Sequence, residues 1–123
     1  MARCLIAAAL SLCLASVPAQ AGEADVVAAT VQRRAVGLYD FDVTVRSRDT
    51  GWDRYADRIE ILAPDGTVLG SRVLLHPHDD EQPFTRDVYG VRIPAGTERV
   101  TVRAHFKPVG FDGATLTVKL PRP

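Results

Sequence analysis

Residues 76–84 hold the side chains that are best suited to metal chemistry. The stretch reads HPHDDEQPF and places two of the three histidines of the chain one residue apart, followed at once by three carboxylates. Pro77 favours extended backbone on both sides, and in an extended segment residues i and i+2 point to the same face, about 6.5–7 Å apart. Two imidazoles at this separation can share one metal ion.

The types of these side chains indicate which metal they would bind. Zn²⁺ and Cu²⁺ accept neutral imidazole together with carboxylate oxygen, whereas Cu⁺ prefers sulfur ligands, which this segment lacks. The metal hypothesis is therefore that this segment binds zinc or copper(II). We expect no other cofactor. Its ligands would be His76 and His78, with Asp79, Asp80 or Glu81 completing the shell.

The same stretch is also typical of a polar loop between two strands. Prolines bound it, and its carboxylates can have no role other than to keep the segment that crosses between the strands in contact with water. A single His-x-His pattern has low specificity, so we prefer the loop and keep the metal site as the alternative. In both cases we expect the side chains of His76 and His78 to be exposed. His105 is a candidate third ligand, because strand parity points it away from the face of Val100 and Val102, but a plain surface position is preferred.

A second polar stretch, residues 49–60, reads DTGWDRYADRIE. Asp49, Asp53 and Asp57 recur every four residues, and hard cations such as Ca²⁺ take several carboxylate oxygens. The positions of the glycine and the carboxylates match no EF-hand loop, so we do not retain a calcium site.

Two aromatic residues of this stretch, Trp52 and Tyr55, would suit a platform for carbohydrate. We prefer a structural interpretation, because large aromatic side chains are usually buried in domains of this size. Trp52 is therefore predicted to pack into the core beside the strand that carries Ile59 and Ile61.

Catalytic motifs are absent from the sequence. After the N-terminal segment the only serines are Ser47 and Ser71, and neither lies in a G-x-S-x-G turn. The sequence has no HExxH pattern, no glycine-rich phosphate loop and no cysteine nucleophile outside that segment. We predict that the protein is not an enzyme.

The N-terminal segment has the three parts of a secretory signal. Arg3 gives a positive start, residues 5–14 form a short apolar run, and Ala19-Gln20-Ala21 supplies the small residues that signal peptidase needs. We predict cleavage after Ala21, which leaves residues 22–123 as one domain. The apolar run is too short to span a bilayer, so we expect no membrane anchor.

Both cysteines, Cys4 and Cys13, lie within this segment. Lipidation at Cys13 is an alternative, but Leu12 is bulky where lipoprotein processing requires a small residue, so the soluble form is preferred. The cleaved domain would have no disulfide, and its net charge would be near −1, which argues against a nucleic-acid binder. We expect a bacterial protein that is periplasmic or secreted.

The rest of the chain alternates apolar and polar residues with a period of two, which is the pattern of half-buried strands. In LYDFDVTVR, for example, Tyr39, Phe41, Val43 and Val45 would share one face. Turn residues such as Pro64-Asp65-Gly66 separate the runs. The predicted strands cover residues 24–31, 38–46, 58–62, 68–75, 85–93, 99–106 and 114–120. This pattern predicts an all-β fold, an antiparallel sandwich of about seven strands of immunoglobulin or fibronectin type III kind, with a small barrel as the alternative.

Three blocks of the chain carry a resemblance: DTGWDRYAD (49–57), PDGTVLG (64–70) and HPHDDEQPFTR (76–86). They are similar to those of a family of small exported proteobacterial proteins, and the likeness extends over residues 49–120. The resemblance implies an export signal, a compact β domain and no established activity. In that family we expect a His-Gly-aromatic element near the last turn. Here that element reads Val109-Gly110-Phe111, and the missing histidine would weaken any metal site that uses it.

These observations favour a non-catalytic, exported β-sandwich that acts as a binding or interaction module of the cell envelope. Its partner would be an envelope protein or a glycan, bound through the loops or a free sheet edge. The alternative is a periplasmic protein that binds a divalent transition metal through the HPH segment.

Overall fold

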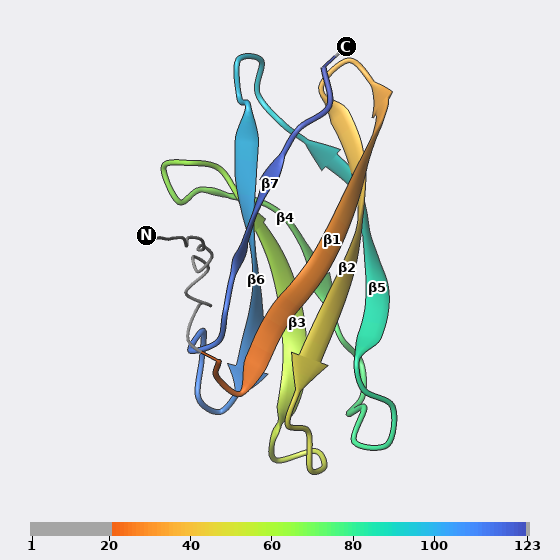
Figure 1. Cartoon of the computed structure of the whole chain (residues 1–123), viewed down its shortest axis with the longest axis vertical. Helices are drawn as coiled ribbons and strands as arrows, with labels where there is room; N and C mark the ends of the chain where they lie inside the picture. Colours follow the sequence, from red (N-terminus) through yellow and green to blue (C-terminus); the bar gives the residue numbers. More distant parts are fainter. Residues whose placement is uncertain (1–20, 123) are drawn as a thin grey trace, which may run out of the picture.

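The computed structural model describes residues 21–122, so residues 1–20 of the predicted signal peptide lie outside it. Seven strands make up the fold (Figure 1). They are β1 (Ala24–Ala35), β2 (Leu38–Ser47), β3 (Tyr55–Leu62), β4 (Val68–Val73), β5 (Phe84–Arg92), β6 (Arg99–Lys107) and β7 (Leu116–Lys119). Between residues 21 and 122 there is no helix of the length and apolarity needed to cross a membrane.

The strands form two antiparallel sheets, one with the order β1-β2-β5 and the other with the order β4-β3-β6-β7. The fourth strand pairs with β3, whereas in immunoglobulin constant domains it joins the sheet of the first, second and fifth strands. The predicted all-β sandwich is therefore confirmed, and the position of β4 favours the fibronectin type III variant over the immunoglobulin constant one.

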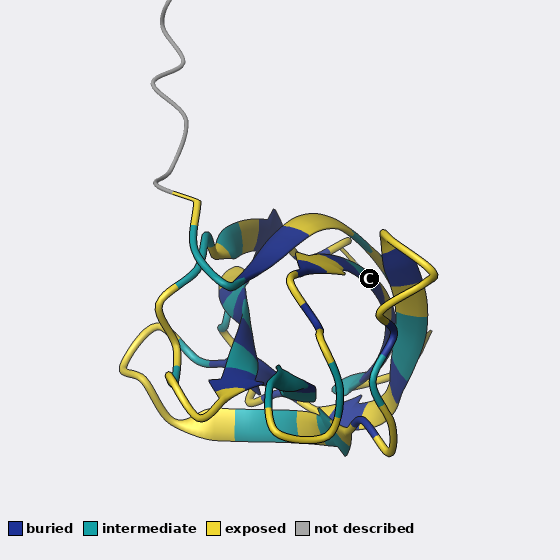
Figure 2. Cartoon of the chain, turned by 90° about the horizontal axis from the view of Figure 1, so that it is seen from below, coloured by how far each residue is buried: buried dark blue, intermediate teal, exposed yellow. Residues whose placement is uncertain are grey.

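The core lies between the sheets and follows the predicted alternation. Viewed from one end of the sandwich, the strands alternate between buried and exposed residues along their length (Figure 2). Phe41, Val43 and Val45 of β2 are fully buried, as are Val102 and Phe106 of β6. Burial of each such side chain is worth roughly 1.5–3 kcal/mol. The core side chains therefore hold the two sheets face to face.

The turn at Pro64-Asp65-Gly66 joins β3 to β4 as its residue types predict. Gly66 has a φ of 91°, a value that glycine adopts without steric cost. The Asp65 carboxylate accepts a hydrogen bond of 3.0 Å from the backbone N–H of Thr67. This short connection fixes the register of β4 on β3.

The edges of the two sheets meet along one seam between β4 and β5. Arg72 donates to the backbone oxygen of Asp87 at 3.0 Å and also forms an ion pair with the Asp87 carboxylate. Close approach is possible because β4 has a glycine here. A Cβ at Gly70 would lie 2.9 Å from Cγ2 of Val91.

The other seam, between β1 and β7, closes at one end only. The Val26 N–H donates to the oxygen of Ala114 at 2.9 Å, and a Cβ at Gly113 would lie 1.7 Å from the Ala24 oxygen. Towards Ala35 no backbone hydrogen bond joins the two strands within residues 21–122. The two edge strands are therefore not paired through their backbones at that end.

The strand order gives the molecule two different ends. What we call the lower end carries the β2–β3, β4–β5 and β6–β7 loops (residues 48–54, 74–83 and 108–115), and the upper end carries the β1–β2 and β5–β6 turns (residues 36–37 and 93–98) and residues 120–122 (Figure 1).

The structure corrects the predicted position of Trp52. This side chain is 63% exposed, because a tight turn from Gly51 to Arg54 holds it outside the sheet, before β3 begins at Tyr55. The interior positions of β3 are taken by smaller residues, including Ile59 and Ile61. The core is therefore filled without the side chain of Trp52.

Candidate functional site

The HPH segment lies in the β4–β5 loop, and its two histidines differ in exposure. His76 is exposed as predicted, but His78 is only 3% exposed, which corrects the expectation that both face solvent. The ring of His78 stacks on Phe84 with centroids 4.0 Å apart and lies 4.4 Å from the ring of His76. The structure thus brings the two imidazoles together, but it uses one of them for packing.

Arg86 determines the protonation state of His78. Its Nη2 lies 2.8 Å from Nε2 of His78, and a guanidinium can only donate, so Nε2 accepts and is unprotonated. Burial lowers the pKa of His78, and the positive charge of Arg86 lowers it further. In the resulting neutral ring Nδ1 carries the proton, and this buried atom has no hydrogen-bond partner within residues 21–122.

The carboxylate of Asp49 ties the HPH loop to the rest of the lower end. Asp49 is 7% exposed and accepts three hydrogen bonds: from Ser47 Oγ at 2.7 Å, from the Ala56 N–H at 3.0 Å and from the His78 N–H at 2.8 Å. A buried carboxylate is stable only when its oxygens are satisfied in this way. Asp49 therefore joins the end of β2, the start of β3 and the loop.

Gln82 completes this network from the other side of the loop. Its Oε1 accepts from the Ser47 N–H at 2.8 Å, and its Nε2 donates to Ser47 Oγ at 3.2 Å and to the His78 oxygen at 2.9 Å. The polar residues of the HPHDDEQPF stretch therefore act largely as a structural lock, which we call the Asp49–Gln82 network.

The predicted metal ligands are only partly gathered. Asp79, Asp80 and Glu81 are exposed, and between residues 21 and 122 no group of three or more His, Asp or Glu side chains is arranged to hold a metal ion. The positive charge of Arg86 next to His78 would oppose a second cation there. Metal binding by His76 and His78 stays a prediction.

The other carboxylates of the second polar stretch have separate neighbours. Asp57 contacts Nδ1 of His105 at 2.6 Å, and the His105 ring meets the edge of Phe111 with centroids 4.8 Å apart. Asp53 is exposed on the β2–β3 loop. Asp57 therefore contacts His105, whereas Asp49 belongs to the Asp49–Gln82 network.

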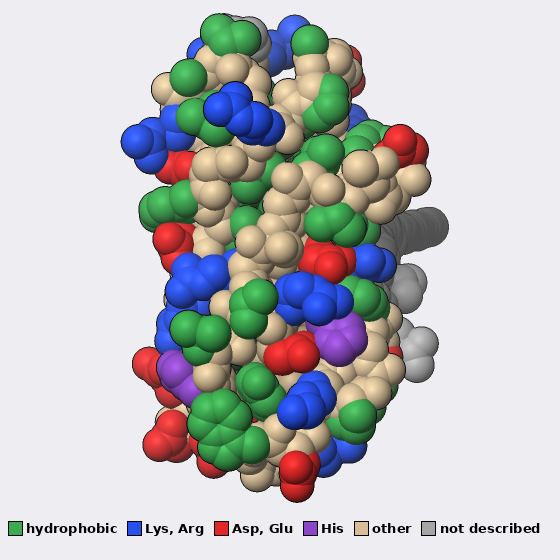
Figure 3. Space-filling model, turned by 180° about the vertical axis from the view of Figure 1, so that it is seen from behind, with side chains coloured by type: hydrophobic (Ala, Val, Ile, Leu, Met, Phe, Trp, Pro, Cys, Tyr) green, Lys and Arg blue, Asp and Glu red, His purple; other side chains and the backbone are tan. Residues whose placement is uncertain are grey.

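A charged layer covers the lower part of the four-stranded sheet on its outer side. Seen from behind, basic, acidic and histidine side chains lie side by side there (Figure 3). Glu60 forms ion pairs with Arg58 and Arg103, and the Arg103 guanidinium lies 3.7 Å from the centre of the Phe111 ring. These groups satisfy one another, so the layer is complete without a ligand.

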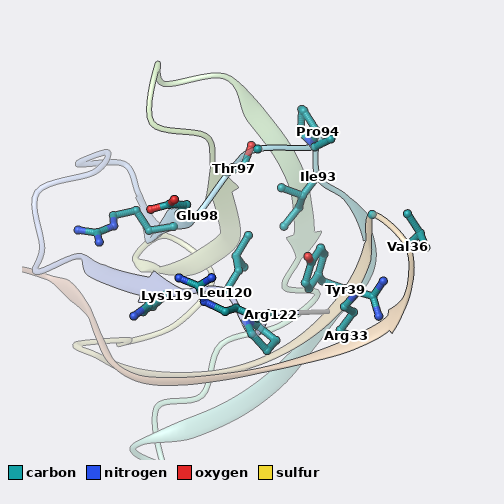
Figure 4. Close-up of a pocket in the computed structure, with 15 residues that line it drawn as sticks. Arg33, Val36, Tyr39, Ile93, Pro94, Thr97, Glu98, Lys119, Leu120 and Arg122 are labelled. Atoms are coloured by element: carbon teal, nitrogen blue, oxygen red, sulfur yellow. The ribbon is translucent and has the colours of Figure 1, made fainter.

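A pocket of about 490 Å³ opens at the upper end (Figure 4). It lies between the β1–β2 turn, the β5–β6 turn and the residues that follow β7. Tyr39, Ile93 and Leu120 converge at its centre, and each is at most 9% exposed. The floor is therefore apolar and is held in place by the core strands.

The rim of the pocket is charged. Arg33, Arg99, Lys119 and Arg122 line it together with one carboxylate, Glu98. None of the four basic side chains forms an ion pair with a residue of the described range 21–122. Sequence reasoning missed this site, because each residue is unremarkable alone. Only the strand order, which the sequence does not give, brings residues 33–37, 93–99 and 119–122 to one end.

Comparison with known proteins finds a relative in an archaeon. The chain is 38% identical over 96 residues to a protein of the archaeon Halomicrobium mukohataei that is described as "Putative lipoprotein". The match covers 78% of this chain and 47% of the relative, so the chain spans about half of the relative's length. No family model and no solved structure matches the chain. The relative is archaeal, so the comparison does not show the proteobacterial family that the three sequence blocks suggested.

Proposed function

We propose that the protein is an exported, non-catalytic binding module of the cell envelope and that the upper pocket holds its ligand. The observation that carries this proposal is the pocket itself. It combines an apolar floor with a few charged groups around the rim, and its volume of about 490 Å³ lies in the range of small-molecule sites. The ligand would be a component of the envelope, either free or as part of a protein or glycan.

The floor is preformed, which favours binding. Tyr39 and Ile93 belong to the continuous core, and Leu120 donates its N–H to the Glu98 oxygen at 2.9 Å. A ligand that enters therefore meets side chains that have already lost their conformational freedom on folding, and this reduces the entropy cost of binding.

The chemistry of the lining supports a non-catalytic role. The pocket is lined by no histidine, serine or cysteine, and its only carboxylate is Glu98, on the exposed β5–β6 turn. General acid–base catalysis needs a positioned side chain whose pKa lies near the working pH, and nucleophilic catalysis needs an activated nucleophile. Cations and apolar side chains can hold and orient a ligand.

Export is supported by the N-terminal segment of the sequence and by the description of the archaeal relative as a lipoprotein. We place the mature protein in the periplasm or outside the cell, beginning at Gly22. The intact mass of protein recovered from the envelope tests this. A lipidated species that begins at Cys13 would replace the soluble form with an anchored one, and an uncleaved chain would refute the proposed processing.

The pocket is tested with a bulky substitution that fills it. We would titrate fractionated small molecules from the cell envelope into the isotopically labelled protein and follow the amide signals of Gly37 and Gly96, which line the pocket. A ligand should shift these signals and raise the melting temperature. Both effects should vanish in Ala95→Trp and persist in Ala28→Trp, an exposed position on β1 outside the pocket. Equal effects in the two variants, or no fraction that moves these signals, would refute the proposal.

A further inference from the structure

The charge around the upper pocket is unusual for this chain. Four of the 14 basic residues after residue 21 line the pocket, but only one of the 15 acidic residues does so. The protein as a whole has almost no net charge, so the excess of positive charge belongs to this end. A concave site lined by one sign of charge concentrates the field and attracts ions of the opposite sign.

The basic residues of the pocket lack the carboxylate partners that several basic residues of the strands have. Arg58, Arg72 and Arg103 on the strands each form an ion pair with a carboxylate. Within residues 21–122, Arg99 and Lys119 at the pocket form none. Their side chains are exposed and therefore free to turn towards an anion at the mouth.

The floor adds a second requirement. Beneath the cations, Tyr39, Ile93 and Leu120 present apolar surface, and Val36 stands at the rim with 87% exposure (Figure 4). Such surface gains free energy when it is covered by an apolar group. A small inorganic anion would satisfy the cations but leave this floor in contact with water.

We infer that the ligand of the upper pocket is an amphipathic anion: a carboxylate, sulfate or phosphate head group that carries a hydrocarbon tail. This inference rests on the proposed function and specifies its ligand class. The tail covers the floor at Tyr39 and Leu120, and the head group lies at the rim between Arg99 and Lys119. The hydroxyl groups of Thr97 and Tyr39 are additional donors in the lining.

The experiment compares ligands that share a ten-carbon chain and differ in charge. Decanoate, 1-decanol and decyltrimethylammonium would be titrated, below their aggregation concentrations, into exported protein purified from cells that express the full chain. Decanoate should bind at least tenfold more tightly than the alcohol, and the cation should not bind. Butyrate should bind much more weakly than decanoate, because each CH₂ that is buried contributes about fourfold in affinity.

Two charge-matched variants locate the head group. Arg99→Gln/Lys119→Gln removes two cations at the pocket, and Arg46→Gln/Arg48→Gln removes two exposed cations that do not line it. The first should weaken decanoate binding about tenfold or more and leave decanol binding unchanged. The second should change neither by more than about twofold.

The outcomes separate this inference from the proposed function. If decanol binds as tightly as decanoate, and Ala95→Trp abolishes both, the pocket is a ligand site but its ligand is not anionic. If only another envelope compound shifts the pocket signals, the ligand class is wrong and the function stands. If vesicles with anionic lipid bind while monomeric decanoate does not, binding is a surface effect and the amphiphile inference fails.

Discussion

The two ends of the sandwich use their polar residues in opposite ways. At the lower end, Asp49 and Gln82 are almost fully engaged in hydrogen bonds that hold three segments together. At the upper end, Arg99 and Lys119 have no ion-pair partner among residues 21–122 and surround an apolar floor. Polar groups that bond to one another stabilise a fold, whereas exposed charges without an ion-pair partner beside an open pocket are available to a ligand.

This difference shows why a cluster of reactive residue types is a poor guide to function. Histidines and carboxylates crowd the HPHDDEQPF stretch, yet His78 packs on Phe84 and accepts from Arg86. The stretch was conspicuous because a long crossing between two sheets needs many polar groups to satisfy its backbone. Substitutions at the lower end should therefore affect stability, and those at the upper end should affect binding.

The largest expected effect is that of Asp49→Ala. The change removes three hydrogen bonds to a buried carboxylate and leaves the N–H groups of Ala56 and His78 without their acceptor. We expect a loss of about 3–4 kcal/mol in the free energy of unfolding. Urea denaturation measures it. Asp79→Ala, at an exposed carboxylate of the β4–β5 loop, should cost less than about 0.5 kcal/mol. Equal losses in the two variants would contradict a stabilising role of the Asp49–Gln82 network.

The two histidines give the next largest contrast. His78→Ala removes a buried ring that stacks on Phe84, and we expect it to cost about 2 kcal/mol. His76→Ala removes an exposed ring and should cost less than about 0.5 kcal/mol. The same denaturation measurements test both. Similar small losses would mean that the loop is as open as the sequence alone suggested.

The strands were predictable because alternation is a local property. The period-two pattern of β2 and β6 follows from one buried and one exposed face, and the residues 64–66 carry the turn chemistry in themselves. Even so, β1 runs to Ala35, beyond the predicted residue 31, because the polar second half of the strand still pairs with β2.

The site was not predictable in the same way. The burial of His78 depends on Phe84 and on the distant Asp49, and the exposure of Trp52 depends on where β3 begins. The pocket arises from residues at three places in the sequence that meet only when the strand order is known. Pairing across sheets is a tertiary property, and residue type and spacing do not contain it.

Acid should weaken the lower end through His78. The folded-state pKa of this ring lies below the ordinary value of 6.5, so between the two values the unfolded chain binds a proton that the folded protein does not. Stability is therefore expected to fall as the pH is lowered from about 6.5 and to stop responding to this group below its folded pKa. The fall should be smaller in His78→Gln and unchanged in His76→Gln, as followed by melting temperature against pH. A further fall below pH 3.8 belongs to carboxylates such as Asp40, whose pKa the Gly90 N–H and Arg34 lower.

At the upper end, urea denaturation should show almost no change in the free energy of unfolding. Arg99→Gln/Lys119→Gln removes two exposed side chains without ion-pair partners among residues 21–122, so we expect a change within about 0.5 kcal/mol. A slight gain in stability is consistent with relief of repulsion from Arg33 and Arg122. A loss above 1 kcal/mol would mean that these cations hold the fold, and the contrast between the two ends would then be wrong.

The smallest expected effect concerns metal binding by the HPH segment. Both imidazoles would have to be unprotonated and free, but Nε2 of His78 already accepts from Arg86, and the guanidinium repels a divalent cation. In calorimetric titrations of tag-free protein we expect Zn²⁺ and Cu²⁺ to bind no more tightly than about 10 μM, close to −7 kcal/mol. Arg86→Gln should strengthen any binding, because it frees Nε2 and removes the charge, whereas Arg46→Gln should not. Tighter binding by the native protein that disappears in His76→Ala/His78→Ala would refute this view. The lower end would then be a metal site as well as a lock.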